Sequence, residues 1–281
     1  MSLVSMKDIL EKARKEGYGV GAFNIFNVES MEGLIEIAEE KRSPVIIAYY
    51  EGLKENMNIE TIAVVGKKLA ENAKVPVVLH LDHGQSYEYC ITALRNGFSS
   101  VMIDASICTL EENIAITKKV VGACKHLGVT VEAELGHVGT GSTYGAEDDD
   151  SYKTIPEEVE KFIQETDVDA LAVSIGNAHG AYRSEPKIDH DRMIQLNQVS
   201  SIPLVLHGGS GIPDNDFRQL VKEGICKINI GTEFMNGASE AIIDSINTGK
   251  KSILDFCLAS KKGAKKVAAI RMDVFGSTGK A

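Results

Sequence analysis

Hydrophobic and polar positions fall into blocks along the chain, with short continuous apolar runs separated by longer amphipathic ones. The apolar runs are rich in β-branched residues, and continuous apolar runs are typical of parallel strands that are buried on both faces. The pattern predicts eight strands, at residues 20–24, 45–48, 77–81, 100–103, 130–134, 170–174, 204–206 and 227–230.

The amphipathic segments between these runs carry apolar residues at helical spacing. Asn27 is suited to cap the first of them, and Pro156 and Pro213 stand where a helix would begin. We expect helices at residues 28–40, 59–72, 109–127, 156–166, 189–198 and 213–223, and a lysine-rich helical extension from about Thr248. Alternation of strand and helix predicts right-handed crossovers, and eight units favour a closed (β/α)8 TIM barrel.

Length and charge narrow the class of protein. A chain of 281 residues suits one barrel domain spanning residues 1–281, since such barrels typically need about 250 residues. The net charge of −10 argues against binding to nucleic acid or to an anionic membrane surface. We find no signal sequence, no apolar run of membrane-spanning length and no CxxC pair among the five cysteines, so we expect a cytoplasmic, reduced protein.

Three histidines follow predicted strands. His83, His179 and His207 each stand at the carboxyl end of a different strand. The carboxyl ends of all strands in such a barrel face the same mouth, where barrel enzymes keep their active sites. Three imidazoles that leave one position open suit a catalytic zinc ion, although imidazole also binds other divalent metals. His80 and His137 are alternative candidates, more consistent with a supporting and an accessory position.

Carboxylates gather at the same strand ends. Asp82, next to His83, could act as a general acid/base or could orient a metal ligand. Asp104 and Glu134 end neighbouring strands, and Glu132 shares a strand face with Glu134. Buried carboxylates need partners, so these residues could serve a metal, a second metal position or a structural role.

Glycine-rich segments follow the last two strands. Residues 208–211 read Gly-Gly-Ser-Gly, and residues 229–232 read Asn-Ile-Gly-Thr. The loops after strands seven and eight are the usual phosphate site of this barrel, and glycines let backbone N–H groups approach an anion. A second glycine-rich loop, residues 136–153, is long enough to be functional, although a solvated acidic loop is the alternative.

Together, these motifs resemble the class II, metal-dependent fructose-bisphosphate aldolases, with the tagatose-bisphosphate aldolase branch closest. The resemblance runs from Ala-Phe-Asn at 22–24 through Leu-His-Leu-Asp-His-Gly at 79–84 and Glu-Ala-Glu-Leu-Gly at 132–136. It continues through Ala-His-Gly at 178–180 and His-Gly-Gly-Ser-Gly at 207–211 to Asn-Ile-Gly-Thr-Glu at 229–233, and so covers essentially the whole chain.

The resemblance implies zinc on His83, His179 and His207, with Asp82 as the catalytic acid/base. It implies an alternative metal position at Asp104 and Glu134, and a monovalent cation near the backbone of Gly180 and Gly208. The substrate would be a phosphorylated sugar, cleaved to dihydroxyacetone phosphate and glyceraldehyde 3-phosphate by a homodimer or homotetramer. The residues expected to bind it are Asn24, Gly180, Arg183, Gly208, Gly209, Ser210, Asn229, Ile230, Gly231 and Thr232.

The chain departs from the family pattern in three places. Relatives often carry a glutamate soon after the Glu-Leu-Gly segment, but here the first acidic residue of the loop is Glu147, which we take as the loop proton carrier. Asn177 replaces a frequent threonine, and Arg183 replaces a common lysine and could bind the second phosphate or a sugar hydroxyl.

Three alternative functions stay open. The first is an aldolase for another phosphorylated substrate, such as 6-phospho-5-dehydro-2-deoxygluconate. The second is a zinc hydrolase, which would leave the two glycine loops without a purpose. The third is a non-catalytic barrel subunit, which the intact histidine and aspartate set disfavours.

Overall fold

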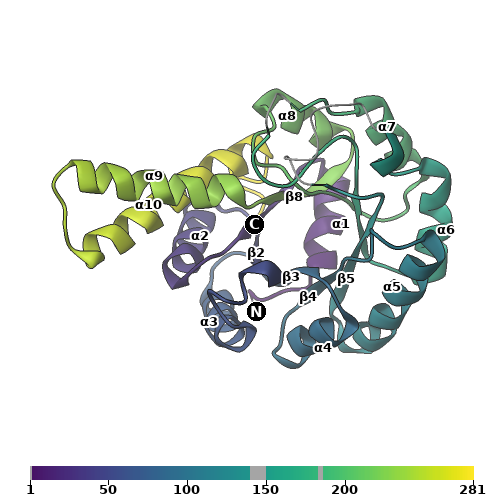
Figure 1. Cartoon of the computed structure of the whole chain (residues 1–281), viewed down its shortest axis with the longest axis horizontal. Helices are drawn as coiled ribbons and strands as arrows, with labels where there is room; N and C mark the ends of the chain where they lie inside the picture. The colour runs from purple at the N-terminus through teal and green to yellow at the C-terminus, as the bar shows by residue number, and fades with distance from the viewer. Residues whose placement is uncertain (1, 140–149, 183–185) are drawn as a thin grey trace.

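A closed parallel barrel organises the chain. The computed structural model describes residues 2–139, 150–182 and 186–281. Its strands pair in sequence order, and β8 pairs with β1, so the predicted TIM barrel is confirmed (Figure 1). The strands are β1 (Val20–Asn24), β2 (Val45–Tyr50), β3 (Val77–Gly84), β4 (Ser100–Ile103), β5 (Thr130–Leu135), β6 (Ala170–Val173), β7 (Leu204–Leu206) and β8 (Ile225–Ile230).

Helices surround the barrel, and all six predicted ones are present within three residues of their expected ends. The largest difference is at α5, which ends at Cys124 because residues 125–127 form a 3-10 turn. They are α2 (Val28–Lys41), α3 (Ile59–Asn72), α5 (Leu110–Cys124), α6 (Pro156–Thr166), α7 (His190–Val199) and α8 (Asp214–Lys222). The lysine-rich extension forms α10 (Ile253–Val274). Three helices were not among those predicted: α1 (Met6–Glu16), α4 (Tyr87–Arg95) and α9 (Thr232–Asn247).

Alternation along each strand divides the apolar side chains between two clusters. One cluster lies between the sheet and the helices, and it includes Phe23, Ile47, Leu79, Leu171 and Leu206. The other fills the barrel interior, and it includes Ala22, Ile46, Val78, Ala172 and Val205. The interior members are mostly small or branched, which leaves room inside the barrel for polar side chains nearer the mouth.

Helix α1 closes the end of the barrel opposite the mouth. Its N-terminus is capped by Ser5, whose hydroxyl accepts a hydrogen bond from the backbone N–H of Asp8. Its buried face carries Met6 and Leu10, which pack with the interior cluster against Val20 at the start of β1. The helix and the interior cluster therefore close this end of the barrel with apolar side chains, and we call this end the floor.

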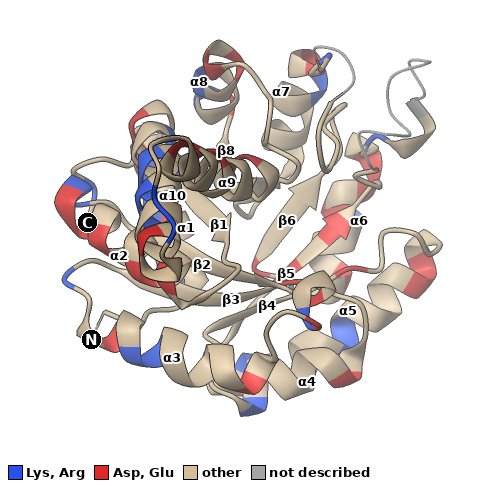
Figure 2. Cartoon of the chain, turned by 60° about the vertical axis from the view of Figure 1, so that its left-hand side comes forward, with Lys and Arg blue, Asp and Glu red and all other residues tan. Residues whose placement is uncertain are grey.

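Helices α9 and α10 pack against each other and project from the barrel as a hairpin (Figure 1). Lysines of α10 face acidic residues of α2, as Figure 2 shows. Lys261 bonds Glu32 at 3.0 Å, and Lys265 bonds Glu36 at 3.1 Å and Glu40 at 2.9 Å. Among the described residues, no helix combines the length and the apolar character that crossing a membrane would require.

Candidate active site and metal centre

The three predicted histidines meet at the barrel mouth. β3 continues past its predicted end to Gly84, and this brings His83 to the mouth with a left-handed backbone, at φ 50°. His179 and His207 follow β6 and β7. The ring centroids are 4.6 Å apart for His83 and His207, 4.7 Å for His83 and His179, and 5.7 Å for His179 and His207. A side chain held at positive φ costs free energy, and such strain is characteristic of functional sites.

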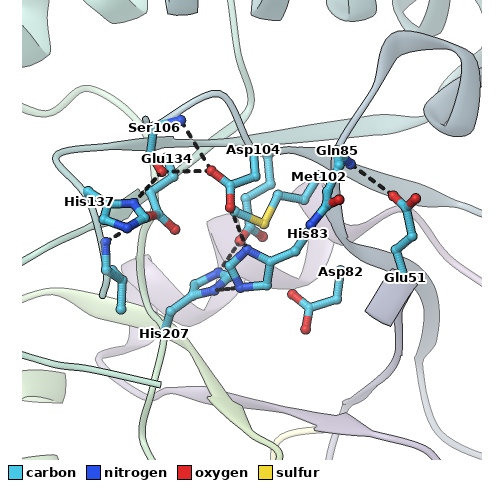
Figure 3. A network of polar contacts seen from close by, with 12 residues as sticks. Glu51, Asp82, His83, Gln85, Met102, Asp104, Ser106, Glu134, His137 and His207 are labelled. Atoms are coloured by element: carbon cyan, nitrogen blue, oxygen red, sulfur yellow. Dashed lines mark hydrogen bonds and ion pairs between the residues drawn. The ribbon is translucent and has the colours of Figure 1, made fainter. Parts of the chain in front are cut away.

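A chain of hydrogen bonds sets the protons on two of these rings (Figure 3). Nε2 of His207 lies 2.8 Å from Oε1 of Glu132, whose carboxylate can only accept, so this nitrogen carries a proton and Nδ1 is bare. Nδ1 of His83 donates in the same way to Asp104, at 2.8 Å. Nε2 of His83 then donates across 2.8 Å to the bare Nδ1 of His207. Nε2 of His83 and Nδ1 of His207 therefore face each other at hydrogen-bond distance at the mouth.

The side chains around these two nitrogens form a donor set that could hold a divalent cation. Ligand atoms of His83, Glu134, His179 and His207 all lie within 4.8 Å of one another. Nε2 of His179 is buried and has no hydrogen-bond partner among the described residues. Three imidazole nitrogens and a carboxylate suit zinc and related metals. The donor set and the unpaired nitrogen both fit a metal ion.

Asp104 lies beside this cluster rather than in it. Its Oδ2 bonds the outer nitrogen of His83, and its Oδ1 accepts from the backbone N–H and the hydroxyl of Ser106. Ser106 in turn bonds Nδ1 of His137 at 2.9 Å, and the accessory role of His137 stays a prediction. The role of Asp104 as ligand of a second metal position stays a prediction.

The electrostatics of the site follow from burial and close charges. Burial lowers the pKa of His83, but the charge of Asp82 and the hydrogen bond to Asp104 outweigh it and raise that pKa to about 9. Burial, helped by the nearby Asp104, raises the pKa of Glu134 to about 8. Burial and the charge of His83 together lower the pKa of His179 to about 4 and hold the pKa of His207 well below its usual value.

Asp82 is held by two amides. Its Oδ2 accepts from Asn24 at 2.6 Å, and its Oδ1 accepts from Asn229 at 2.9 Å. Burial alone would raise the pKa of Asp82, but the charge of His83 and the contribution of His207 hold it well below its usual range. The carboxylate is therefore ionised, oriented and next to the metal cluster, which is what a general base requires.

The two glycine loops lie beside the same histidines. Gly208 has φ 63°, and a Cβ at this residue would lie 2.2 Å from the carbonyl oxygen of Ala178. A Cβ at Gly231 would lie 2.7 Å from Oδ1 of Asn24. Gly231 caps α9 without a side chain, and α9 starts at Thr232 directly after β8 ends at Ile230, so the helix N-terminus faces the mouth.

Side chains join the loops to one another. Ser210 Oγ accepts from the backbone N–H of Glu233, which connects the loop after β7 to α9. The hydroxyl of Tyr182 accepts from the N–H of Ala178 and donates to the carbonyl of Gly208. Gly209 donates its backbone N–H to the carbonyl of Asn229, at 3.1 Å. A cavity of about 1350 Å³ borders Ser210 and Thr232 and extends between α9 and α10.

Some predicted residues cannot be placed. Glu147 and Arg183 lie outside the described residues, so the loop proton carrier and the second phosphate contact stay predictions. Gly180 is described and adopts φ 85° close to His179. Asn177 donates to the carbonyl of His207 at 3.0 Å, so the residue that replaces threonine connects the strands that carry two of the histidines.

Two contributors were not expected from the sequence. Tyr182 bridges the loops after β6 and β7, and only its closeness to Gly180 in sequence could have suggested it. Lys227 is fully buried inside the barrel, where it pairs with Glu132. A lysine within the buried strand β8 is a signal that could have been noticed, because a buried lysine needs a partner.

Comparison with known proteins places the chain in a family. The profile of class-II fructose-bisphosphate aldolases matches residues 4–280. The chain is 42% identical over 258 residues to fructose-bisphosphate aldolase of Staphylococcus aureus, which covers 89% of this chain and 88% of that one. It is 40% identical to the enzyme of Thermus caldophilus, over 99% of this chain and 100% of the relative.

Solved structures agree with the sequence matches. The crystal structure of the YdjI aldolase from Escherichia coli K12 superposes with a TM-score of 0.90 at 35% identity, over 99% of both chains. A putative fructose-1,6-bisphosphate aldolase from Coccidioides immitis gives 0.88 at 28% identity, over 98% of this chain and 97% of the other. The chain therefore belongs to the class II fructose-bisphosphate aldolase family, and it is a metal-dependent aldolase.

Proposed function

We propose that the enzyme is a zinc-dependent ketose-bisphosphate aldolase. It would reversibly cleave fructose 1,6-bisphosphate or tagatose 1,6-bisphosphate to dihydroxyacetone phosphate and glyceraldehyde 3-phosphate. The observation that carries the proposal is the convergence of His83, His179 and His207 beside an ionised Asp82. A zinc ion held there supplies Lewis-acid stabilisation of the negative charge that develops next to the ketone as the carbon–carbon bond breaks.

Asp82 has the central catalytic role in this proposal. Its ionised carboxylate accepts the proton of the C4 hydroxyl as the C3–C4 bond breaks. The amides of Asn24 and Asn229 keep that carboxylate in one orientation, so no reorganisation is needed during the proton transfer. Glu147 would return a proton to the remaining three-carbon unit, and Glu134 and Asp104 would offer the alternative metal position.

The glycine loops would hold a phosphate of the substrate. Neither Gly208 nor Gly231 tolerates a Cβ, because Ala178 and Asn24 lie too close. Glycine at these positions would also let backbone N–H groups approach an anion. The hydroxyls of Ser210 and Thr232 lie where they can donate further hydrogen bonds. We place the remaining contacts at Gly180, Gly209, Asn229, Ile230 and Arg183, and a monovalent cation at the backbone near Gly180 and Gly208.

Parallel kinetics test the function and the choice of substrate together. Cleavage of the two bisphosphates is followed in a coupled assay, before and after chelation and again after zinc is restored. Turnover of either sugar that is lost on chelation and returns with zinc supports the proposal. Undiminished turnover after verified metal removal would contradict the proposed function. Inactivity on both sugars would favour an aldolase for 6-phospho-5-dehydro-2-deoxygluconate, or a non-catalytic subunit.

We also propose a homodimer or homotetramer in the cytoplasm. Ile253, Leu254 and Leu258 at the tip of the α9–α10 hairpin are 68–71% exposed, and covering such aliphatic side chains would favour association. The five cysteines are all free, as expected in a reducing compartment. Light scattering of the purified enzyme measures the oligomeric state, and a monomer at micromolar concentration would contradict the proposal.

A further inference from the structure

A buried ion pair lies inside the barrel, one step below the metal cluster. Lys227 of β8 and Glu132 of β5 are both 0% exposed. Lys227 precedes Asn229 by two residues, and Glu132 precedes Glu134 by two, so each faces the same interior as its partner at the mouth. The interior below the pair is lined by small or apolar residues such as Ala22.

Lys227 donates a hydrogen bond to one oxygen of Glu132 and makes an ion-pair contact with the other, and the pair reaches a metal-site histidine. Nζ of Lys227 lies 3.0 Å from Oε1 and 2.9 Å from Oε2 of Glu132. The same Oε1 lies 2.8 Å from Nε2 of His207. Glu132 therefore connects the buried ammonium group of Lys227 to the imidazole of His207. Nε2 of His80 also lies 3.7 Å from Oε2 of Glu132.

Glu132 serves two requirements of metal binding. His207 must present Nδ1 as the bare nitrogen, and the accepting carboxylate of Glu132 ensures this by taking the proton of Nε2. A fully buried carboxylate is in turn costly unless a cation compensates its charge, and Lys227 is that cation. Lys227 therefore touches no metal ligand directly, yet it determines how one ligand is held.

We infer that Lys227 is a positioning residue, which fixes His207 toward the metal through Glu132. The inference rests on the proposed metal site and extends it to a residue that lies deeper in the barrel. The ammonium holds both carboxylate oxygens, so the acceptor of His207 cannot rotate away. Removal of either member of the pair loosens the ring of His207 while the other ligands keep their places.

Direct measurement of zinc affinity tests this, with turnover playing no part. Zinc dissociation constants are measured by competition with a chromophoric chelator for the wild type, Lys227→Met, Glu132→Gln and the double variant. Loss of a group that orients a ligand typically weakens binding about 10- to 100-fold, and we expect this for both single variants. Because Lys227 acts through Glu132, the double variant should bind no more weakly than Glu132→Gln alone.

A spectroscopic signature separates positioning from general loss of structure. The visible spectrum of the cobalt(II)-substituted enzyme reports ligand geometry, and it should change in Lys227→Met and recover in part in Lys227→Arg. Arg271→Met is the matched control: Arg271 is 9% exposed and pairs with Glu233 and Asp214, away from the four ligands. This control should keep the zinc affinity and the cobalt spectrum of the wild type.

The outcomes are distinct. If Lys227→Met does not fold, the double variant carries the test, because it leaves neither buried charge uncompensated. Folded variants that bind zinc within twofold of the wild type, or losses that add in the double variant, would overturn the inference alone. A wild-type enzyme that binds no zinc would overturn the proposed function and the inference with it.

Discussion

The two ends of the barrel are built from the same strands but to opposite specifications. The floor is apolar: Met6 and Leu10 of α1 pack against Val20 and Val78, and these four side chains are fully buried. The mouth gathers histidines and carboxylates, one of them on a residue with φ 50°. The floor has what stability requires, whereas the mouth keeps a strained backbone and a buried ring nitrogen, Nε2 of His179, that has no hydrogen-bond partner in the described part of the chain.

The largest expected loss of activity comes from a substitution at the mouth. We expect His83→Ala to lose the metal and, with it, measurable cleavage. A Lewis-acid metal stabilises a transition state by several kcal/mol. Steady-state kinetics and metal content measure the effect, and thermal unfolding checks the fold. The matched control is His126→Ala, an exposed histidine of the connection before β5, which should keep full activity. Comparable turnover in both variants would contradict the assignment of the site.

Asp82 is the next test, because it should separate chemistry from metal binding. Asp82→Asn keeps the volume but cannot accept a proton, so we expect kcat to fall about 10²- to 10⁴-fold with zinc retained. Asp169→Asn provides the matched change at the floor end, where this carboxylate accepts from the backbone N–H of Val131 and pairs with Lys7. Unchanged turnover in Asp82→Asn would reduce Asp82 to a residue that orients its neighbours.

The floor should respond in the opposite way. Leu10 is fully buried beneath the barrel, and Leu10→Ala removes apolar contacts and leaves a cavity. We expect a loss of about 2–5 kcal/mol in the free energy of unfolding, measured by urea denaturation. The kcat of the folded fraction should be unchanged, because Leu10 packs in the apolar interior cluster, which includes none of the four residues of the metal cluster. A fall in kcat without a fall in stability would show that the two ends are coupled.

The sequence predicted the barrel well because parallel strands leave a strong local pattern. β1, β4 and β7 begin and end where the apolar runs do. Helix α1 was missed although Met6, Ile9, Leu10 and Ala13 have helical spacing and Gly17 ends it with φ 69°. The signal was present, but nothing in a strand-by-strand reading requires a helix before the first strand.

The site was predictable only in part. Histidines at strand ends converge in any barrel, so His83, His179 and His207 could be grouped without coordinates. The pairing of Lys227 with Glu132 depends on closure of the barrel, which brings β8 and β5 to face each other across the interior. Local pattern carries no information on which buried side chains meet across that space, and this is why the pair was not foreseen.

The smallest expected effect lies at the rim of the mouth. Asp189 caps α7 through the N–H of Arg192, and its Oδ2 lies 3.2 Å from both Lys153 Nζ and Arg192 Nε. Burial is the largest single influence and would raise the pKa of Asp189, but the hydrogen bonds from Arg192 and Lys153 together lower that pKa overall. A lowered folded-state pKa stabilises the fold above the unfolded value, about 3.9, and that contribution is lost as the pH falls through the folded value.

Asp189→Asn keeps the cap but removes the charge, so it should cost about 0.2–1 kcal/mol at pH 7, as exposed ion pairs do. Urea unfolding at stepwise lower pH should show the difference shrinking toward zero as the carboxyl group becomes protonated. A difference that stays constant with pH would assign the effect to the cap and not to the charge. Since the catalytic groups lie deeper, kcat should not change. A substitution at the rim would then affect stability and not activity, as a substitution at the floor does.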